Sequence, residues 1–151
     1  MKNALIVGGL ILGTATMAIA QEPRRVIDVL KQASCGCCSG WVLRMQEAGF
    51  TVNVQNVSGD TLNDAKVASG FSDDLWACHT ASVSGYTVEG HVPVKEITRL
   101  LTERPVALGI ATPGMPTGSP GMEYGEQLEA YNVMLINLDN SIEVYASYPG
   151  N

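Results

Sequence analysis

Three cysteines within four residues, Cys35-Gly36-Cys37-Cys38, are the side chains of this sequence best suited to chemistry. Each thiolate is a soft, electron-rich group that can bind a metal ion or break a disulfide. A bridge between adjacent Cys37 and Cys38 would be strained, because the favoured disulfide geometry does not suit neighbouring residues. Since only Cys78 lies at a distance, the crowding disfavours an ordinary two-disulfide framework and indicates a reactive or metal-binding site.

The spacing of the three cysteines leaves two chemistries open. Cys35 and Cys38 alone form Cys-x-x-Cys, which is a redox motif when it lies between a strand and a helix. Cys37 adds a third thiol that would compete for any disulfide but would help a metal site. Thiolate sulfurs can bridge more than one Cu(I), so three or four of them can hold a small cluster. On ligand type, Cu(I) is the favoured ion and zinc comes second.

Three further donors follow downstream. Cys78 is a candidate fourth sulfur ligand, and the alternative is a small buried apolar side chain. His79 is a candidate imidazole ligand, but neighbours in a strand point to opposite faces, so both reach one metal only if the backbone there is irregular. His91 precedes a predicted helix and is either a ligand or supporting group, or a helix-capping or surface histidine.

A near repeat in the last third of the chain carries two methionines. Pro113-Gly114-Met115-Pro116 is followed by Pro120-Gly121-Met122-Glu123. Methionine usually fills a core, but this segment has few other apolar side chains. Thioether sulfur suits Cu(I) and is rarely used for zinc. Met115 and Met122 are therefore candidate ligands that move the prediction from zinc toward copper.

The elements that must position these donors follow from hydrophobic periodicity and turn residues. The helix after the cysteines would also stabilise thiolates, because its N-terminus offers free N–H groups and a positive dipole end. Five glycines and three prolines over residues 109–125 predict a Gly/Pro/Met-rich loop. The order indicates an α/β sandwich, and a cysteine motif between the first strand and first helix is the thioredoxin-like placement. The predicted elements are a strand at 26–30, a helix from about 38 to 48, a strand at 50–55, a helix at 62–69 capped by Asp60 or Thr61, a hairpin of 80–83 and 86–89, a helix from Pro93 to before Pro105, and a C-terminal β-hairpin of 131–138 and 142–148.

The first twenty residues predict export. Lys2, an apolar stretch from Ala4 to about Thr16, and Ala18-Ile19-Ala20 before a polar segment are typical of a secretory signal peptide cleaved after residue 20. The alternative, an uncleaved anchor, is disfavoured because the run is short and interrupted by Gly and Thr. Residues 21–151 then form one exported domain, and no later segment is long enough to span a bilayer.

Charge and missing motifs exclude other classes of function. The net charge of −6 and the lack of a Lys/Arg run argue against nucleic acid as a partner. The sequence has no P-loop, no Gly-x-Ser-x-Gly elbow and no His-Glu-x-x-His, so hydrolase chemistry has no support.

In combination, these motifs resemble one family over nearly the whole predicted mature chain. The family is the CopG-like group of bacterial periplasmic copper-resistance proteins. The resemblance implies a thioredoxin-like fold, Cu(I) bound at the Cys-x-Cys-Cys site in the periplasm, and a role in copper homeostasis in which Cu(I)/Cu(II) redox conversion is one open activity. Ala77-Cys78-His79-Thr80 occupies the place of the usual thioredoxin proline, which weakens a general disulfide-exchange interpretation. The motifs that carry the resemblance are Cys35-Gly36-Cys37-Cys38 with Trp41, Ala48-Gly49-Phe50, Cys78-His79-Thr80-Ala81, Gly85-Tyr86, Glu89-Gly90-His91-Val92-Pro93 and the two methionine segments.

The leading prediction is a periplasmic copper-binding protein, and whether it is also an enzyme stays open. The main alternative is a periplasmic thiol-disulfide oxidoreductase using Cys35 and Cys38, and the third is a structural zinc or disulfide domain. Copper ions are the expected cargo, with other periplasmic copper carriers or efflux components as candidate partners. The candidate metal ligands are Cys35, Cys37, Cys38, Cys78, His79, His91, Met115 and Met122.

Overall fold

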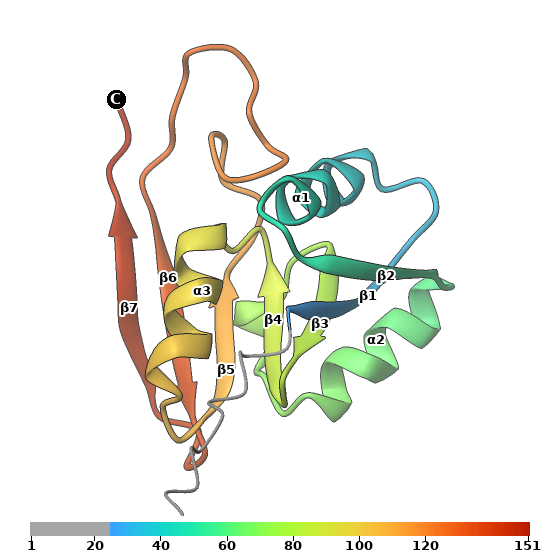
Figure 1. Cartoon of the computed structure of the whole chain (residues 1–151), viewed down its shortest axis with the longest axis vertical. Coiled ribbons are helices and arrows are strands. Elements are labelled where there is room, and N and C mark those ends of the chain that lie inside the picture. The colour runs from blue at the N-terminus through green and yellow to red at the C-terminus, as the bar shows by residue number, and fades with distance from the viewer. Residues whose placement is uncertain (1–24) are drawn as a thin grey trace, which may run out of the picture.

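The computed structural model describes residues 25–151, in which seven strands form one mixed sheet of order β2-β1-β3-β4-β5-β6-β7 (Figure 1). The predicted mixed α/β class is confirmed, and the thioredoxin-like assignment stays a prediction. The predicted signal peptide lies outside the described residues. The elements are β1 (Val26–Lys31), α1 (Gly36–Glu47), β2 (Thr51–Asn56), α2 (Gly59–Ala68), the short 3-10 helix η1 (Asp73–Leu75), β3 (His79–Val83), β4 (Tyr86–Gly90), α3 (Val94–Glu103), β5 (Ala107–Thr112), β6 (Tyr131–Asn137) and β7 (Ile142–Tyr148).

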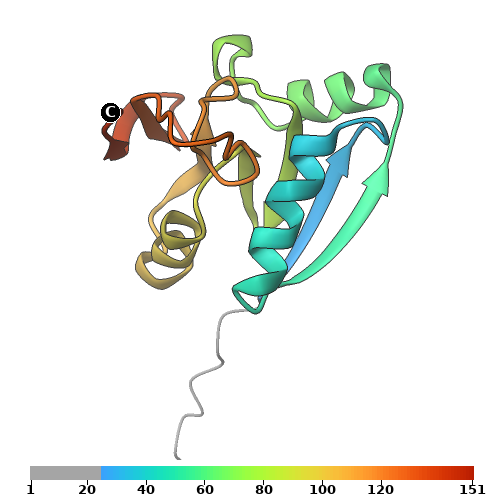
Figure 2. The same ribbon diagram turned by 90° about the horizontal axis from the view of Figure 1, so that it is seen from above.

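The helices cover the two faces of the sheet unequally. Helices α1 and α3 lie on one face and α2 lies on the other (Figure 2). Trp41 and Met45 of α1, both fully buried, pack into the same core as Ile97 and Leu100 of α3. The sheet contributes alternate residues to that core, as Ile27 and other inward-facing strand positions show. The main core therefore lies between the sheet and the α1/α3 layer.

Strand pairing brings the ends of two strands together beside the cysteines. Strand β1 pairs in parallel with β2 and antiparallel with β3, so that Lys31, at the end of β1, lies opposite His79, at the start of β3. The cysteine segment follows β1, and Cys78 precedes β3. Both cysteine segments consequently emerge from the same end of the sheet.

The prediction of a loop over 109–125 is wrong for its first residues, because 107–112 form the interior strand β5. Gly109 pairs with Thr87 of β4 on one side and with Ile136 of β6 on the other. A Cβ on Gly109 would overlap the backbone of Thr87, and the β5–β6 register shifts between Ala107 and Gly109. The glycine therefore marks a bulge and a close backbone approach inside a strand, as glycine often does.

Helix starts also differ from the prediction. Helix α2 begins at Gly59, and its N-cap is Ser58 rather than Asp60 or Thr61. Ser58 has extended backbone angles, and its hydroxyl accepts the Thr61 N–H at 3.2 Å, which is the standard capping geometry. Helix α1 begins at Gly36, two residues earlier than expected, because a cysteine caps it.

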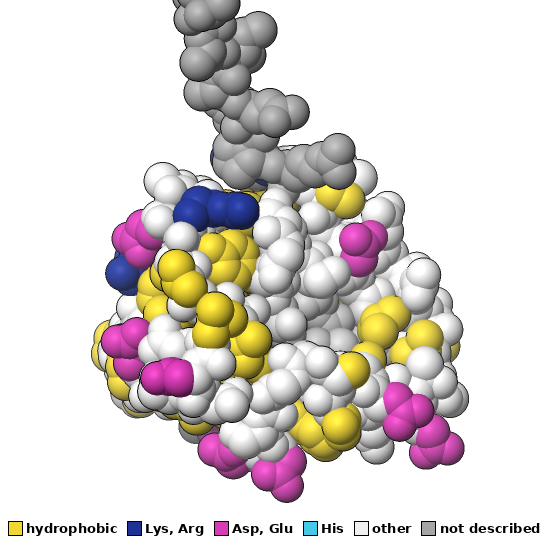
Figure 3. Space-filling model, turned by 90° about the horizontal axis from the view of Figure 1, so that it is seen from below, with side chains coloured by type: hydrophobic (Ala, Val, Ile, Leu, Met, Phe, Trp, Pro, Cys, Tyr) yellow, Lys and Arg dark blue, Asp and Glu magenta, His cyan; other side chains and the backbone are white. Residues whose placement is uncertain are grey.

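Both histidines are buried, and the described part of the chain contains no candidate membrane span. Within residues 25–151, no helix is long and apolar enough to cross a bilayer. Figure 3 shows the end of the molecule that is lowest in Figure 1, where acidic and hydrophobic side chains are scattered and no histidine is visible. His79 and His91 are both fully buried, on the side of the sheet that α1 covers.

Candidate metal centre

Helix α1 presents the three clustered cysteines from its N-terminus. Cys35 is the N-cap residue, and its Sγ accepts the Cys38 N–H at 3.3 Å. Cys37 is half-buried in the first turn, whereas Cys38 is fully buried. The free N–H groups and positive dipole end of the helix favour negatively charged sulfur at these positions. The cap that starts the helix is thus also a candidate ligand.

Two of the cysteines form a disulfide. Cys35 is bonded to Cys38, while Cys37 and Cys78 are free. The Cys37 Sγ lies 3.6 Å from the Cys35 Sγ of the bridge. The structure thus contains the oxidised form of the Cys-x-x-Cys pair, and these two sulfurs become thiolate ligands only after reduction.

Cys78 joins this cluster from the other segment. Its Sγ lies 3.7 Å from the Cys37 Sγ, across 41 residues of sequence. The four cysteine sulfurs all lie within 4.8 Å of one another. The structure therefore brings Cys78 to the position expected of a fourth sulfur ligand, at the shared end of β1 and β3.

His91 contacts Cys78 with a defined ring nitrogen. Its Nε2 lies 2.9 Å from the Cys78 Sγ, and its Nδ1 lies 2.8 Å from the Pro120 carbonyl oxygen. A carbonyl oxygen only accepts, so Nδ1–H donates to Pro120 and Nε2 presents its lone pair to Cys78. Burial lowers the pKa of His91, which favours the neutral form of the ring. The helix-capping and surface alternatives for His91 are wrong, because the ring is buried and Pro93 is the N-cap of α3.

His79 lies deeper, behind Cys78. Its Nδ1 is 3.7 Å from the Cys78 Sγ, and its ring packs against Trp41 with centroids 4.6 Å apart. The His91 ring meets it edge-on at 5.0 Å. Burial lowers the pKa of His79 well below its usual range, and the nearby His91, Lys66 and Lys31 act in the same direction. His79 Nε2 has no hydrogen-bond partner among residues 25–151.

The backbone at Cys78 is irregular, which resolves the problem of two neighbouring donors. Cys78 lies in a bend before β3, so it does not follow the alternation of the strand. Cys78, His79 and His91 consequently form a second group of donor atoms within 4.8 Å, and it shares Cys78 with the cysteine cluster. Burial, followed by the neighbouring Cys37 thiol, raises the pKa of Cys78 to about 12. A soft metal ion would therefore have to displace a proton from this sulfur.

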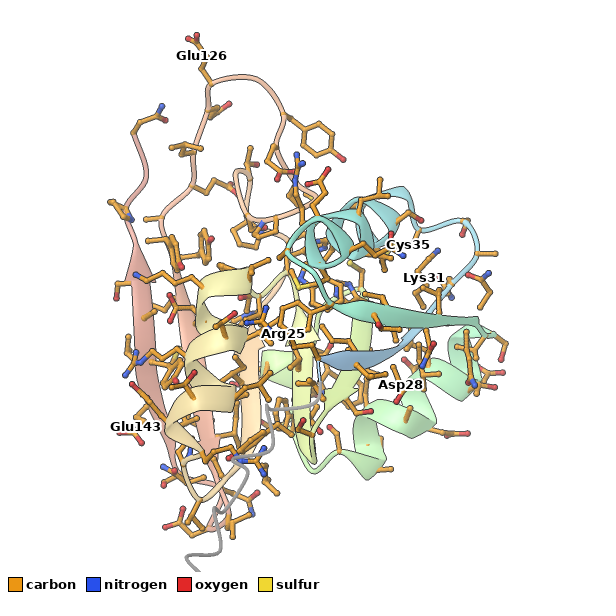
Figure 4. The ribbon with its side chains drawn as sticks, in the orientation of Figure 1. Arg25, Asp28, Lys31, Cys35, Glu126 and Glu143 are labelled. Atoms are coloured by element: carbon orange, nitrogen blue, oxygen red, sulfur yellow. A yellow bond between two sulfur atoms is a disulfide. The ribbon has the colours of Figure 1, made fainter. Side chains whose placement is uncertain are left out.

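Lys31 holds the backbone of the cysteine segment by hydrogen bonds, a role that the sequence did not predict. Its side chain is buried, and its Nζ donates to the carbonyl oxygens of Gln32 at 3.0 Å and Cys35 at 3.5 Å. Figure 4 shows Lys31 and Cys35 near one another at the start of α1. The sequence could have predicted that Lys31 is buried, because it continues the alternating, inward-facing positions of Ile27 and Val29.

The methionine loop closes over the site through its backbone. The Pro120 carbonyl accepts a hydrogen bond from His91, as described above. The next residue, Gly121, contacts α1 so closely that a Cβ there would lie 2.5 Å from the Cys37 carbonyl oxygen and the Trp41 nitrogen. Glu123 then forms an ion pair with Arg44 of α1 at 2.9 Å. Met122, between these contacts, is half-buried beside α1.

Met115 occupies a different place from Met122. It is 52% exposed and lines a cavity of about 600 Å³ whose lining residues include neither a cysteine nor a histidine. The structure thus brings the Met122 segment to the cysteines and leaves Met115 beside Pro113, Tyr131 and Met134.

Comparisons with known proteins identify relatives of this chain. Residues 75–122, which include Cys78 and both histidines, match a family described as "Protein of unknown function, DUF411". No curated protein sequence matches the chain. Two solved structures of a copper resistance protein, copG, are similar to it, each with 40% sequence identity. Form 1 has a TM-score of 0.78 and the alignment covers 85% of this chain and 100% of that one, and form 2 has a TM-score of 0.77 with 82% and 98% covered.

Proposed function

Because the chain belongs to the CopG family of copper resistance proteins, we propose that it binds copper, as Cu(I), at its cysteine cluster and acts in copper resistance in the periplasm. The observation that carries the proposal is the convergence of four cysteine sulfurs within 4.8 Å from two distant segments. Thiolates are the softest ligands that a protein offers, and Cu(I) is the soft ion that they select.

The donors have graded roles in this proposal. Cys35, Cys37, Cys38 and Cys78 supply thiolates that can bridge several Cu(I) ions. His91 offers a fixed Nε2 lone pair beside Cys78, because the Pro120 carbonyl holds its other nitrogen. We assign His79, Met122 and Met115 as further candidate ligands. His79 contacts Cys78, Met122 follows the Gly121 backbone that contacts α1, and Met115 lines a separate cavity.

Redox conversion of copper is part of the same proposal. The reduced Cys35/Cys38 pair can give one electron to each of two Cu(II) ions. The products are two Cu(I) ions, the Cys35–Cys38 disulfide and two protons, so that charge and atoms balance. The disulfide present in the structure corresponds to the protein product of this step.

The decisive test is an anaerobic Cu(I) titration of the reduced protein against a chromophoric competitor. Cys37→Ser removes one sulfur and leaves the Cys35–Cys38 pair intact, and Leu43→Ala, a change at an exposed position of the same helix, is the matched control. We expect Cys37→Ser to lower the Cu(I) affinity by at least about 100-fold, because loss of a group that only supports a ligand already costs about 10- to 100-fold. Equal affinity in both variants would refute the proposal.

A thiol-disulfide oxidoreductase is the second candidate function. The observation that favours it is the Cys35–Cys38 disulfide at the N-terminus of α1, where a thiolate is stabilised. This function predicts disulfide exchange that persists in Cys37→Ser, Met115→Leu and Met122→Leu. Loss of Cu(I) binding in Cys37→Ser without loss of exchange would show that the two activities are separable, and metal analysis of protein purified from the periplasm would reveal a zinc or metal-free structural domain.

A further inference from the structure

A buried ion pair lies on the face of the sheet opposite α1. Lys66 of α2 and Glu89 of β4 are 3% and 0% exposed, and the Lys66 Nζ contacts the Glu89 Oε1. Burying two charges is costly, and apolar residues of similar size often give an equally stable fold. A contribution to stability is consequently a weak explanation for why Lys66 and Glu89 are buried together. The other contacts of Glu89 indicate a different role.

The same carboxylate oxygen holds the residue before Cys78. Glu89 Oε1 accepts the Ala77 N–H at 2.7 Å. Ala77 belongs to the short stretch between η1 and β3 that is neither helix nor strand. Glu89 therefore fixes the backbone at the point where the chain turns into the metal centre.

The next two residues, Gly90 at the end of β4 and His91 just after it, continue the contact. A Cβ on Gly90 would lie 2.5 Å from the Ala77 Cβ, so only glycine allows the two segments to approach this closely. His91 then meets the Cys78 Sγ through Nε2 at 2.9 Å. Three consecutive residues, 89–91, thus contact two consecutive residues, 77 and 78, by a hydrogen bond, by close packing and by a donor atom.

The contacts of residues 89–91 with Ala77 and Cys78 account for the bend at Cys78. In a regular strand, Cys78 and His79 would point to opposite faces, and Cys78 would face α2 rather than α1. With Ala77 held by Glu89, the Cys78 Sγ instead lies 3.7 Å from both the Cys37 Sγ and the His79 Nδ1. The geometry of the fourth sulfur therefore depends on a hydrogen bond made on the other face of the sheet.

We propose that Glu89, held in place by Lys66, is a positioning residue that sets Cys78 for Cu(I) binding through the Ala77 N–H. The inference rests on the proposed function, since it concerns the same cluster. The proposal adds Lys66 and Glu89 to the site. Among residues 25–151, neither side chain forms a hydrogen bond with a cysteine sulfur or belongs to a group of donor atoms around one.

Two double variants separate the hydrogen bond from the ion pair. Lys66→Met/Glu89→Gln removes both charges but keeps a side-chain carbonyl oxygen for the Ala77 N–H, whereas Lys66→Met/Glu89→Leu removes the acceptor as well. Glu96→Leu is the matched control, because Glu96 of α3 is another buried carboxylate, 1% exposed, and it accepts the hydroxyl of Tyr148 of β7 at 2.8 Å. Each variant is titrated with Cu(I) in the reduced state, with and without Cys78→Ser.

We expect the Leu double variant to lose about 10- to 100-fold in Cu(I) affinity, as for other groups that orient a ligand. The Gln double variant and Glu96→Leu should stay near the unaltered protein. In the Cys78→Ser background the Leu double variant should have no further effect, because its action passes through Cys78. Additive losses, or equal losses in the Gln and Leu variants, would overturn the inference.

A measurement without copper keeps this result distinct from failure of the proposed function. In metal-free protein, hydrogen exchange of the Ala77 amide should be slow in the unaltered chain and the Gln variant, and fast in the Leu variant. If exchange behaves in this way and the unaltered protein does not bind Cu(I), then the proposed function fails while the positioning of Cys78 stands. Slow exchange at Ala77 in the Leu variant would refute the positioning role itself.

Discussion

Substitution of Gly121 by alanine tests whether the methionine loop is locked onto the cysteine helix. Gly121 has φ of +85°, where an alanine costs about 1–2 kcal/mol relative to glycine. The new Cβ would also lie 2.5 Å from the Cys37 carbonyl oxygen and the Trp41 nitrogen, so the loop and helix must separate. Overpacking of this kind costs about 1–3 kcal/mol. We therefore expect Gly121→Ala to lower the free energy of unfolding by about 2–5 kcal/mol.

Gly114→Ala is the matched control from the same loop. Gly114 also has positive φ, +70°, but a Cβ there would meet nothing within 4 Å. We expect it to cost only the backbone contribution of about 1–2 kcal/mol. Urea unfolding of the two variants, compared at equal m-value, isolates the contact with α1. Equal losses in the two variants would refute the idea that the loop packs on the helix at Gly121.

Three further predictions concern the buried polar groups around the site. Trp41→Phe removes the indole N–H that donates to the Val92 carbonyl at 2.9 Å, so it should cost about 1–3 kcal/mol of unfolding free energy in urea titrations. Lys66→Met alone leaves a buried carboxylate unpaired and should cost about 3–5 kcal/mol, most of which a second change to a neutral partner should restore. Burial lowers the pKa of both His79 and His91, so below about pH 6.5 the unfolded chain binds more protons than the folded one. Unfolding free energy of the metal-free protein should then fall with falling pH by up to about 1.4 kcal/mol per pH unit for each histidine, and a flat profile between about pH 7 and pH 5 would contradict this.

Local sequence patterns predicted most of the elements because their signals are local. The apolar residues of α1, with Trp41 and Met45 inward, and the Ser84-Gly85 turn between β3 and β4 were sufficient. The start of strand β5 was predicted as a loop because Gly109 was counted with the glycines of the loop that follows. In the structure, Gly109 allows the backbone of Thr87 in β4 to approach closely. That role depends on a neighbouring strand and cannot be read from the segment itself.

The candidate site shows the same division. Residue chemistry alone picked out the cysteines and histidines. The pairing of β1 with β3 brings Cys78 to the other cysteines, and the pairing of β3 with β4 brings His91 to Cys78. The supporting contacts of Lys31 and Glu89 were missed, because a charged residue in an alternating strand is normally taken as solvent-facing. In Glu89 the alternation was correct, but the outward face is covered by α2 and its Lys66.

Cys37 is the residue on which the two candidate functions make opposite demands. A disulfide oxidoreductase needs only Cys35 and Cys38, and a third thiol 3.6 Å from Cys35 is a competitor that can attack the bridge. A copper site uses Cys37, because its Sγ lies 3.7 Å from the Cys78 Sγ. Cys78 also contacts the bridged pair, since its carbonyl oxygen lies 3.6 Å from the Cys38 Sγ, and all four sulfurs lie within 4.8 Å of one another. A third thiol that contacts both Cys35 and Cys78 is therefore a competitor for a redox pair but a useful ligand for a metal ion, which favours metal binding over disulfide exchange.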